Sequence, residues 1–344
     1  MKRQIATIRD VAEAAGVSIA TVSAVLNQSA RVSPAREARV RRAVAELGYA
    51  PQRSARSLRQ GKTMMLSLIV PDIANPFFGT IGRIVEREAD QRGYALLLNN
   101  SGEDEVKERR YLGHARAQDV DGLILSITGP HETYTQDWRE HIGVPTVLVD
   151  RDIPGLDLEC VTTDNRLAAE LAVRHLLSLG HRRIGAVLGP DHLSPSLERS
   201  AGFEAALNGS DAERDPELFR KADFHSPDAY RKCQALLALP KRPTAIFVAN
   251  NLMAIGALRA IAEAGLRVPD DLSVVTIDDF EWANAFYPRL TTVSQPLEAI
   301  GRRAVERLMP LLRGEGPTAP RRELLEPELI VRDSCAPPAR RRRR

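Results

Sequence analysis

The stretch T-I-R-D-V-A-E-A-A-G-V-S-I-A-T-V-S-A-V-L-N, residues 7–27, predicts two short helices joined by a tight turn. Thr7 and Asp10 have the spacing of a capping box, in which each side chain satisfies a backbone N–H at the start of a helix. Gly16 ends this helix, and Ser18 is placed to cap the next one. Two short helices joined by a glycine-containing turn of three or four residues are typical of a helix-turn-helix.

Apolar residues share one face of the second helix and of a third helix that follows. In the second helix this face carries Val22, Val25 and Leu26. The residues turned outward are then Ser18, Ile19, Ala20, Ser23, Ala24 and Asn27. The third helix has Ser33 as its cap and Gly48 as its stop. Its predicted apolar stripe consists of Ala38, Val40, Val44 and Leu47.

Basic charge is concentrated in this part of the chain. The whole chain has 48 Lys or Arg and 45 Asp or Glu, a net charge of +3. Residues 1–62 hold 12 Lys or Arg and four Asp or Glu, a net of +8, so the other 282 residues carry −5. A run of charge is often only a solvated face, and a plain three-helix subdomain is the alternative interpretation. The coincidence of basic charge with a helix-turn-helix favours nucleic acid binding.

The rest of the chain alternates strand-like apolar runs with helix-length segments. A chain of 344 residues exceeds what one core usually serves, so two or three domains are expected. The alternation predicts two units in series, each a parallel sheet with helices on both faces. Ligands of such folds lie at the carboxyl ends of the strands. The predicted strands are 65–70, 95–99, 122–126, 146–149, 184–188, 245–248 and 273–277, and the predicted helices between them include 81–92, 167–179, 196–207 and 253–263.

Composition and cysteine usage are typical of a reduced, cytoplasmic protein. No apolar run approaches 18 residues and no signal-peptide core is present, so neither a membrane span nor export is expected. The three cysteines, Cys160, Cys233 and Cys335, are far apart, which favours buried thiols over disulfides. Residues 61–63, G-K-T, resemble the end of a P-loop, but Arg56 stands where its first glycine is required. We expect no cofactor, no metal site and no catalytic group.

Nine short motifs along the chain are specific to one protein family. They are T-I-R-D-V-A-E-A-A-G-V-S from Thr7, T-V-S from Thr21, L-G-Y-A-P from Leu47, A-R-S-L from Ala55, V-D-G-L-I from Val120, G-H-R-R-I from Gly180, E-R-S-A-G-F from Glu198, V-A-N-N-L-M-A-I-G from Val248 and L-T-T-V from Leu290. On these motifs, over roughly residues 5–332, the chain resembles the LacI/GalR family of bacterial transcription regulators. The resemblance implies an N-terminal all-α helix-turn-helix headpiece and an α/β periplasmic-binding-protein-like core of two doubly wound parallel-sheet subdomains.

The resemblance also implies a domain organisation. The expected parts are a headpiece 1–51, a hinge helix or linker 52–62, a core 63–335 and a basic, disordered tail 336–344. The N-subdomain of the core is expected at about 63–163 and 294–325, and the C-subdomain at about 164–293 and 326–335, with chain crossings near Thr163, Ser294 and Glu326. The tail lacks leucine heptads, so a homodimer is expected in preference to a tetramer.

In the family, the second helix enters the major groove, and each subunit of a homodimer reads half of a near-palindromic operator. The base-contacting positions correspond to Ile19, Ala20 and Ala24, and none of these side chains forms hydrogen bonds. Direct readout must then use thymine methyl groups, or Ser23 and Asn27. The complete set of candidate DNA contacts is Thr7, Ser18, Ile19, Ala20, Thr21, Ser23, Ala24, Asn27, Ala55 and Leu58; Ser18, Thr21 and Ser23 are assigned to phosphates.

The hinge segment 52–59 is too short to be a stable helix by itself. The resemblance implies that this segment becomes ordered on the operator and that Leu58 inserts into the minor groove. The free-energy cost of unstacking base pairs there is offset by additional contacts between the protein and the bent DNA. An exposed linker leucine is the alternative. Gln52 follows Pro51 where the family usually has asparagine.

Charged and aromatic residues follow several predicted strands, and the resemblance implies that they contact an effector. Carboxylates and amides bond to hydroxyls, arginine binds hydroxyl pairs or carboxylates, and aromatic faces stack on rings. An ion pair between Asp278 and Arg199, or core packing of the aromatic residues, is the alternative. Asn251 stands where the family commonly has an acid, and the arginines leave both a sugar acid and a neutral sugar open. The candidate effector contacts are Phe77, Phe78, Asp150, Arg151, Arg199, Phe224, Asn250, Asp278 and Trp282.

These observations predict a cytoplasmic, nucleoid-associated, ligand-responsive transcription regulator without membrane contact. We expect it to repress a carbohydrate or sugar-acid uptake or catabolism operon by binding double-stranded DNA, with a small-molecule effector. A corepressor-dependent regulator of another small-metabolite pathway is the alternative. A periplasmic sugar-binding protein would require a signal peptide in place of residues 1–61, and an enzyme would require an acid–base pair such as Asp150 and Asp278.

Overall fold

The computed structural model describes most of the chain. The described residues are 6–27, 30–49, 62–117, 120–130, 134, 143–153, 155–156, 158–285, 287–316 and 321–338. The chain divides into two compact units, Met1–Thr63 and Met64–Arg344, which we call the headpiece and the core. The predicted hinge residues Ala55 and Leu58 and the arginine tail lie outside the described residues.

The described part of the headpiece contains the helices α1 (Ile8–Ala15), α2 (Ile19–Asn27) and α3 (Pro34–Leu47). The predicted capping box starts α1: the Thr7 N–H donates to Asp10 Oδ2 at 2.7 Å, and Thr7 Oγ1 accepts from the Asp10 N–H at 3.4 Å. The helix ends at Gly16, whose φ of +62° favours glycine. Ser18 Oγ accepts from the Thr21 N–H at 3.2 Å, so Ser18 caps α2 as predicted.

A small apolar core joins the three helices. The valines predicted for α2 are buried in it. The stripe predicted for α3 is partly wrong, because Ala38 and Leu47 are exposed whereas Ala43 is buried. Ala38 lies two residues from the buried Val40, which places it about 200° around the helix, on the opposite side. Ser33 precedes α3 but forms no side-chain capping hydrogen bond.

The described residues of the core form two six-stranded sheets. The first contains β1 (Met65–Val70), β2 (Ala95–Asn100), β3 (Gly122–Leu125), β4 (Thr146–Val149), β5 (Glu159–Thr163) and β11 (Arg322–Leu325). The second contains β6 (Ile184–Leu188), β7 (Phe219–Lys221), β8 (Ala245–Val248), β9 (Ser273–Ile277), β10 (Thr291–Ser294) and β12 (Glu328–Ile330). The first sheet is parallel throughout, in the order β11-β5-β4-β3-β1-β2. The order of the second is β12-β10-β9-β8-β6-β7, with β12 antiparallel, and the predicted fold class is confirmed.

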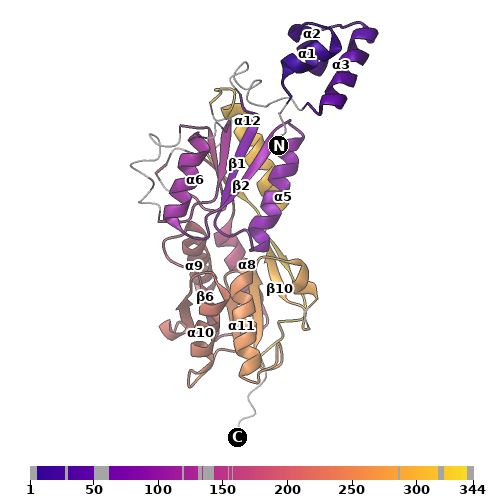
Figure 1. Ribbon diagram of the computed structural model, residues 1–344. Coiled ribbons are helices and arrows are strands. Elements are labelled where there is room, and N and C mark those ends of the chain that lie inside the picture. Colours follow the sequence, from indigo (N-terminus) through magenta and orange to yellow (C-terminus); the bar gives the residue numbers. More distant parts are fainter. Residues whose placement is uncertain are drawn as a thin grey trace. The chain divides into compact units, whose positions relative to one another are not determined.

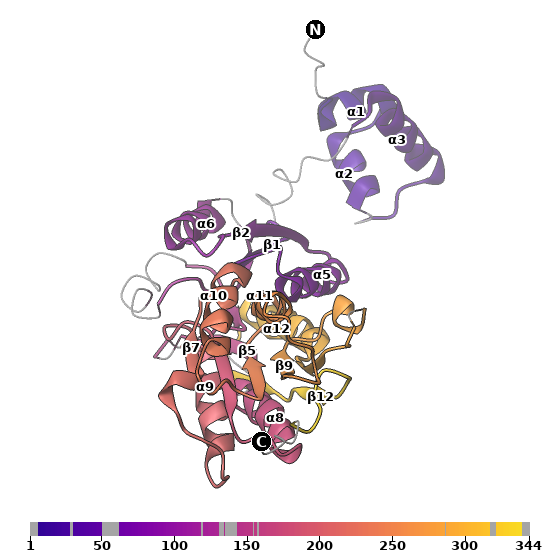
Figure 2. The same ribbon diagram turned by 90° about the horizontal axis from the view of Figure 1, so that it is seen from below.

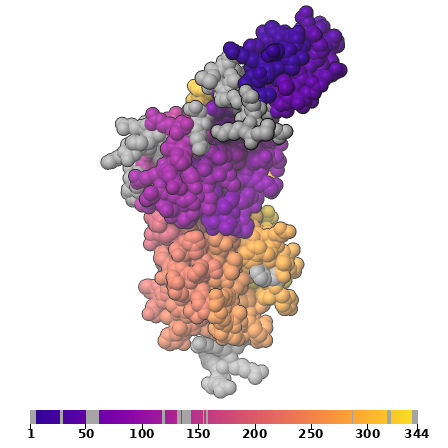
Figure 3. All heavy atoms as spheres, viewed as in Figure 1, coloured from indigo at the N-terminus to yellow at the C-terminus, as the bar shows by residue number. Residues whose placement is uncertain are grey.

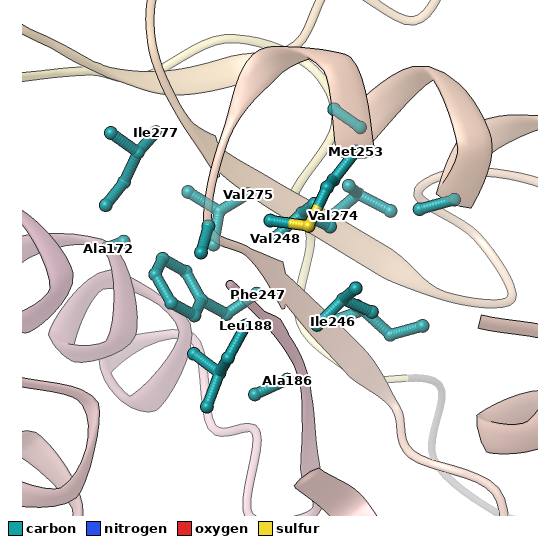
Figure 4. Close-up of a cluster of buried hydrophobic side chains, with 14 of the residues drawn as sticks. Ala172, Ala186, Leu188, Ile246, Phe247, Val248, Met253, Val274, Val275 and Ile277 are labelled. Atoms are coloured by element: carbon teal, nitrogen blue, oxygen red, sulfur yellow. The ribbon is translucent and has the colours of Figure 1, made fainter. Parts of the chain in front are cut away.

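Helices cover both faces of each sheet. Those of the first sheet are α5 (Pro76–Asp90), α6 (Glu105–Ala117) and α12 (Leu297–Leu311). Those of the second are α8 (Asn165–Ser178), α9 (Ser194–Leu207), α10 (Ser226–Leu237) and α11 (Asn251–Glu263), with the short turns η2 (Pro216–Leu218) and η3 (Glu281–Asn284). Both ribbon views place α5 and α6 on opposite sides of β1 and β2 (Figures 1 and 2). In the second sheet, Phe247 lies beside Ala172 of α8, while its neighbour Val248 lies beside Met253 of α11 (Figure 4).

The described chain passes between the two sheets at three places. It leaves the first sheet after Thr163, returns after Ser294 and leaves again after Leu325. Thr163 Oγ1 donates to Gln295 Oε1 at 2.6 Å, and the Asp164 N–H donates to Leu325 O at 2.9 Å. Hydrogen bonds therefore tie the first connection to each of the other two. We call the parts built on the first and second sheets the first and second subdomains.

Two further expectations concern membranes and thiols. Among the described helices, none combines the length and the apolarity needed to cross a membrane. The three cysteines are free thiols, and Cys160 and Cys233 are buried. Burial raises the pKa of Cys233 to about 12, because a thiolate is poorly solvated there.

Candidate functional site

The candidate DNA-contacting surface lies on the outer side of α2. Ile19 is 44 % exposed, and Ser18 and Ala20 are exposed beside it. A large apolar side chain that the headpiece core does not cover is available for contact with thymine methyl groups. The half-buried candidates on the same helix are Thr21, Ser23 and Ala24.

Thr7, another predicted DNA contact, already uses its hydrogen-bond donors within the headpiece. Thr7 Oγ1 donates to Asp10 Oδ2 at 2.8 Å, and the Thr7 N–H donates to the same oxygen. Both donors of Thr7 are therefore used within the capping box, and a phosphate oxygen would have to compete for them. The side chain of Asn27, like Ala55 and Leu58, lies outside what the structure describes.

A cavity of about 40 Å³ lies between the two subdomains of the core, and we call it the cleft. This volume holds only one or a few water molecules. The space-filling view shows the two subdomains in contact along their boundary on one face (Figure 3). The cleft is lined by eight of the nine predicted effector contacts: Phe77, Phe78, Asp150, Arg151, Arg199, Phe224, Asn250 and Asp278.

Trp282 is the predicted contact that does not line the cleft. It lies in η3, and its ring packs against Phe280 with the centroids 3.4 Å apart. Phe280 belongs to a small apolar cluster with Ala283 and Leu290. In this structure Trp282 therefore packs against a small apolar cluster and does not line the cleft.

Parallel sheets explain why distant residues meet in the cleft. Asp150 and Arg151 follow β4, Asn250 follows β8 after one residue, and Asp278 follows β9. The carboxyl ends of parallel strands share one edge of a sheet, so each sheet presents these side chains to the other. Phe77 and the neighbouring Phe78 enter from the first turn of α5.

Backbone strain is concentrated at the cleft. The described non-glycine residues with positive φ number five, and four of them line the cleft. These four are Glu103, Asp150, Phe224 and Asp278, with φ values of 57°, 65°, 68° and 75°. Such conformations are uncommon for residues with a side chain, cost about 1–3 kcal/mol each and cluster at functional sites. The surrounding fold therefore holds these side chains in place against a local preference.

Arg151 is almost completely buried, and both Nη atoms of its guanidinium already form hydrogen bonds. Nη1 donates to Glu103 Oε2 at 2.9 Å and to Ile127 O at 2.7 Å, and Nη2 donates to Glu103 Oε1 at 2.7 Å. Asp150 Oδ2 lies 3.7 Å from Nε. Despite the opposing effect of burial, the carboxylate of Glu103 raises the pKa of Arg151, so this side chain stays charged.

Arg199 and Asp278 do not form the ion pair that was the alternative interpretation. Arg199 Nε donates to Asn165 Oδ1 at 2.8 Å, and Nη1 donates to Ala249 O at 2.5 Å. Asp278 Oδ1 accepts from Gln295 Nε2 at 2.5 Å, and Oδ2 accepts from the Asn251 N–H at 3.2 Å. Since both oxygens of Asp278 accept hydrogen bonds, it is poorly placed to act as a general base with Asp150.

The carboxylate of Asp150 is destabilised by its burial in the cleft. Burial raises its pKa to about 6, while Arg151 and Arg199 oppose the shift and the other cleft carboxylates add to it. The described residues contain no group of three or more His, Cys, Asp or Glu side chains arranged to hold a metal ion.

Direct contacts hold the two subdomains together beside the cleft. Asn251 Nδ2, on the second subdomain, donates to Asn75 Oδ1, on the first, at 2.9 Å, and both side chains are buried. The Asp152 N–H donates to Ser194 Oγ at 2.9 Å, and Arg322 pairs with Glu198. The structure therefore represents the closed arrangement of the cleft.

Sequence reasoning missed several polar residues that line the cleft. The signal for Glu103 and Gln295 was present, since Glu103 lies three residues after β2, Gln295 directly follows β10, and both side chains are polar. Asn75 precedes Pro76 and caps α5, which alone would mark it as a structural cap. The missed polar lining residues are Asp72, Asn75, Glu103, His225 and Gln295.

Comparison with known proteins places this geometry in a family. The bacterial regulatory proteins of the lacI family match residues 7–52, and the periplasmic binding protein-like domain matches residues 173–335. The ribose operon repressor of Escherichia coli (strain K12) is 35% identical over 332 residues, which are 96% of this chain and 100% of that protein.

Solved structures agree with the sequence match. The lac repressor dimer bound to operator and the anti-inducer ONPF has a TM-score of 0.86 at 30% identity, covering 97% of this chain and 100% of that one. The complex of transcriptional regulator CelR with cellobiose has a TM-score of 0.72 at 33% identity, covering 96% and 99%. This chain belongs to the lacI family of bacterial regulatory proteins, a family of transcriptional regulators. The predicted family is confirmed.

Proposed function

We propose that the chain is a repressor that binds a near-palindromic DNA operator as a homodimer, and that a sugar in the cleft changes its operator affinity. The observation that carries the proposal is the convergence of eight predicted effector contacts from both subdomains on one cavity. The relatives support it, since they include a ribose operon repressor, a regulator in complex with cellobiose and a lac repressor dimer bound to operator.

The proposal assigns roles to the two units. The headpiece and hinge residues given above as candidate DNA contacts would bind the operator, and the eight cleft residues would bind the effector. The proposal places domain and subdomain boundaries at residues 51, 62, 163, 294 and 325. It also places the protein in the cytoplasm, on the nucleoid. The chain would have no catalytic activity, so an assay must recover the bound sugar unchanged.

Opening of the cleft links ligand entry to regulation. Ligand sites commonly enclose about 300–1,000 Å³, far more than the 40 Å³ of the closed cleft. A ligand can therefore enter only when the subdomains part. By its different affinity for open and closed forms, the ligand would shift their populations, with a coupling typically of about 1–3 kcal/mol. The same linkage can serve an inducer or a corepressor.

Selection of genomic fragments by the purified protein tests the function. At about 0.15 M salt nonspecific phosphate binding is weak, so a sequence-specific dimer should recover a few near-palindromic sites. Selection repeated with a panel of neutral sugars and sugar acids should change the yield of those sites for the true effector. Unselective, salt-sensitive binding under all these conditions would contradict the proposal.

A further inference from the structure

The pairing of Glu103 with Arg151 determines which hydrogen-bonding groups of the cleft remain available to a ligand. Arginine commonly binds anions through two parallel N–H donors, one on each Nη atom. In this structure that fork is taken by the two oxygens of Glu103, at 2.7 and 2.9 Å. The side chain of Arg151 is 4 % exposed and that of Glu103 is 25 % exposed, so water screens the pair only on the carboxylate side.

The charged side chains that line the cleft also disfavour an anionic ligand. Four carboxylates, those of Asp72, Glu103, Asp150 and Asp278, face two guanidiniums, those of Arg151 and Arg199. Together these six side chains carry a net charge of −2. An anionic ligand would add a negative charge to a poorly solvated space that already has an excess of them, which costs free energy. Hydroxyl groups, in contrast, donate to carboxylates without adding charge.

Arg199 is the remaining candidate for anion binding. Two of its three nitrogens already donate, to Asn165 and to Ala249 O. Its charge also acts on Asp150, where burial raises the pKa of the carboxyl and Arg199 opposes that rise. Three of its five N–H groups remain without a hydrogen bond in the described part of the chain, two on Nη2 and one on Nη1. Because Nε and Nη1 are each already bonded to the protein, a bidentate anion would have to share one of these two nitrogens with a protein acceptor.

We propose that Glu103 is a specificity-determining residue that occupies the Arg151 fork, so that the cleft takes a neutral polyhydroxy ligand and excludes sugar acids and sugar phosphates. This inference rests on the proposed effector role of the cleft and selects between the neutral and acidic sugars that the sequence left open. The backbone supports it, because Glu103 is held at a φ of 57° where its carboxylate meets Arg151.

Chemical rescue with acetate tests the proposal without knowledge of the effector. Glu103→Ala removes the carboxylate and leaves the fork of Arg151 facing the vacated space. Acetate, which has the head group of the lost side chain, should raise the Tm of this variant saturably and bind at least about tenfold more tightly than to the wild type. Matched sodium chloride solutions control for ionic strength.

Two further variants make the test decisive. Glu103→Gln keeps the size of the side chain and should gain affinity for sulfate, which covers the case in which Glu103→Ala does not fold. Arg151→Met added to Glu103→Ala should abolish the acetate response. A folded Glu103→Ala protein that ignores acetate overturns the proposal. So does acetate or sulfate binding to the wild type that Arg151→Met removes.

A matched pair of ligands tests the chemical class directly. D-ribose and D-ribonate differ in charge but not in the number of carbon atoms, and thermal stabilisation compares them on one protein. Stabilisation of the wild type by the sugar alone supports the proposal, and stronger stabilisation by the acid overturns it. Failure of the acetate rescue leaves selection of an operator unaffected, so it is distinguishable from failure of the proposed function.

Discussion

At the scale of single residues, Asp150 combines burial, a positive φ and neighbours of the same charge. Asp278 and Glu103 are the acidic neighbours, and they act against the two arginines. A side chain in such a position reduces the stability of the ligand-free fold, and a cluster of hydroxyl donors from a ligand would relieve it.

Asp150→Asn should stabilise the ligand-free protein above pH 6. The folded pKa of about 6 lies above the value near 3.9 of an unfolded chain, so the folded state holds the proton more tightly. The fold therefore loses stability as the pH rises and Asp150 ionises. Asparagine removes this loss and tolerates a positive φ, so the variant should gain up to about 3 kcal/mol at pH 8.

Calorimetry at pH 4 and pH 8 measures this effect. The difference between Asp150→Asn and the wild type should shrink towards pH 4, where the native carboxyl is neutral as well. The same substitution at the exposed Asp90 serves as the control and should leave the Tm unchanged at both pH values. A variant that is less stable than the wild type at pH 8 would show that Asp150 is stabilised as a carboxylate.

At the scale of helices, two glycines allow close approach on either side of the second sheet. A Cβ added at Gly202 of α9 would lie 2.1 Å from Arg166 O of α8, and one at Gly256 of α11 would lie 2.1 Å from Ser226 O of α10. In each case the obstacle is backbone rather than a flexible side chain, so the helices themselves would have to separate.

Gly256→Ala should therefore lower the stability of the core by about 1–3 kcal/mol, the usual cost of overpacking. Gly113 in α6 provides a matched control, since a Cβ there meets nothing within 4 Å. Gly113→Ala should stabilise by about 0.5–1 kcal/mol, because alanine loses less conformational freedom than glycine in a helix. Thermal unfolding compares the two, and equal shifts would exclude close helix packing as the reason for Gly256.

The contact between α5 and α11 explains one departure from the family pattern. Asn251 donates to Asn75 Oδ1, which also accepts from the Phe77 N–H at 3.0 Å. The second bond keeps this oxygen pointed at Asn251, where an aspartate would offer no donor. An acid at the start of α11 gains about 0.3–1 kcal/mol from the helix dipole, but losing a buried hydrogen bond costs about 1–3 kcal/mol.

Asn251→Asp should consequently shift the ligand-free protein towards an open cleft. Small-angle X-ray scattering of the ligand-free core should report a larger radius of gyration than for the wild type. The same change at the exposed Asn208 is the control and should leave the scattering unaltered. Superimposable curves for Asn251→Asp and the wild type would show that the asparagine pair does not hold the cleft closed.

At the scale of the whole molecule, the chain consists of two compact units with separate cores. Removal of residues 1–61 should abolish operator binding and leave stabilisation by a cleft ligand intact, because no described residue of the headpiece lines the cleft. Arg199→Ala should have the reverse effect, with operator binding kept and the ligand response lost. Binding titrations and thermal shifts on both variants measure this, and a truncated core without ligand response would contradict it.

The sequence was enough to predict the headpiece helices and most of the residues that line the cleft, because both follow from patterns among residues close together in the chain. The capping box of Thr7 and Asp10 spans three residues, and Asp150 directly follows a predicted strand. The prediction was wrong where burial depends on the side of the helix on which a residue lies. Ala38, for example, lies on the outer face of α3 and is exposed. Trp282 resembles a ligand contact in sequence but packs against Phe280 in the structure, so its contact with an effector stays a prediction.

Neighbours along the chain are enough to predict the headpiece and the core, the alternation of strands and helices, and the strand ends that carry the candidate effector contacts. Tertiary packing brings Glu103 to Arg151, 48 residues away, and Asn75 to Asn251, 176 residues away. A hydrogen bond requires its atoms within about 3 Å. No local pattern encodes that distance, because it is set by how two sheets pack across the cleft.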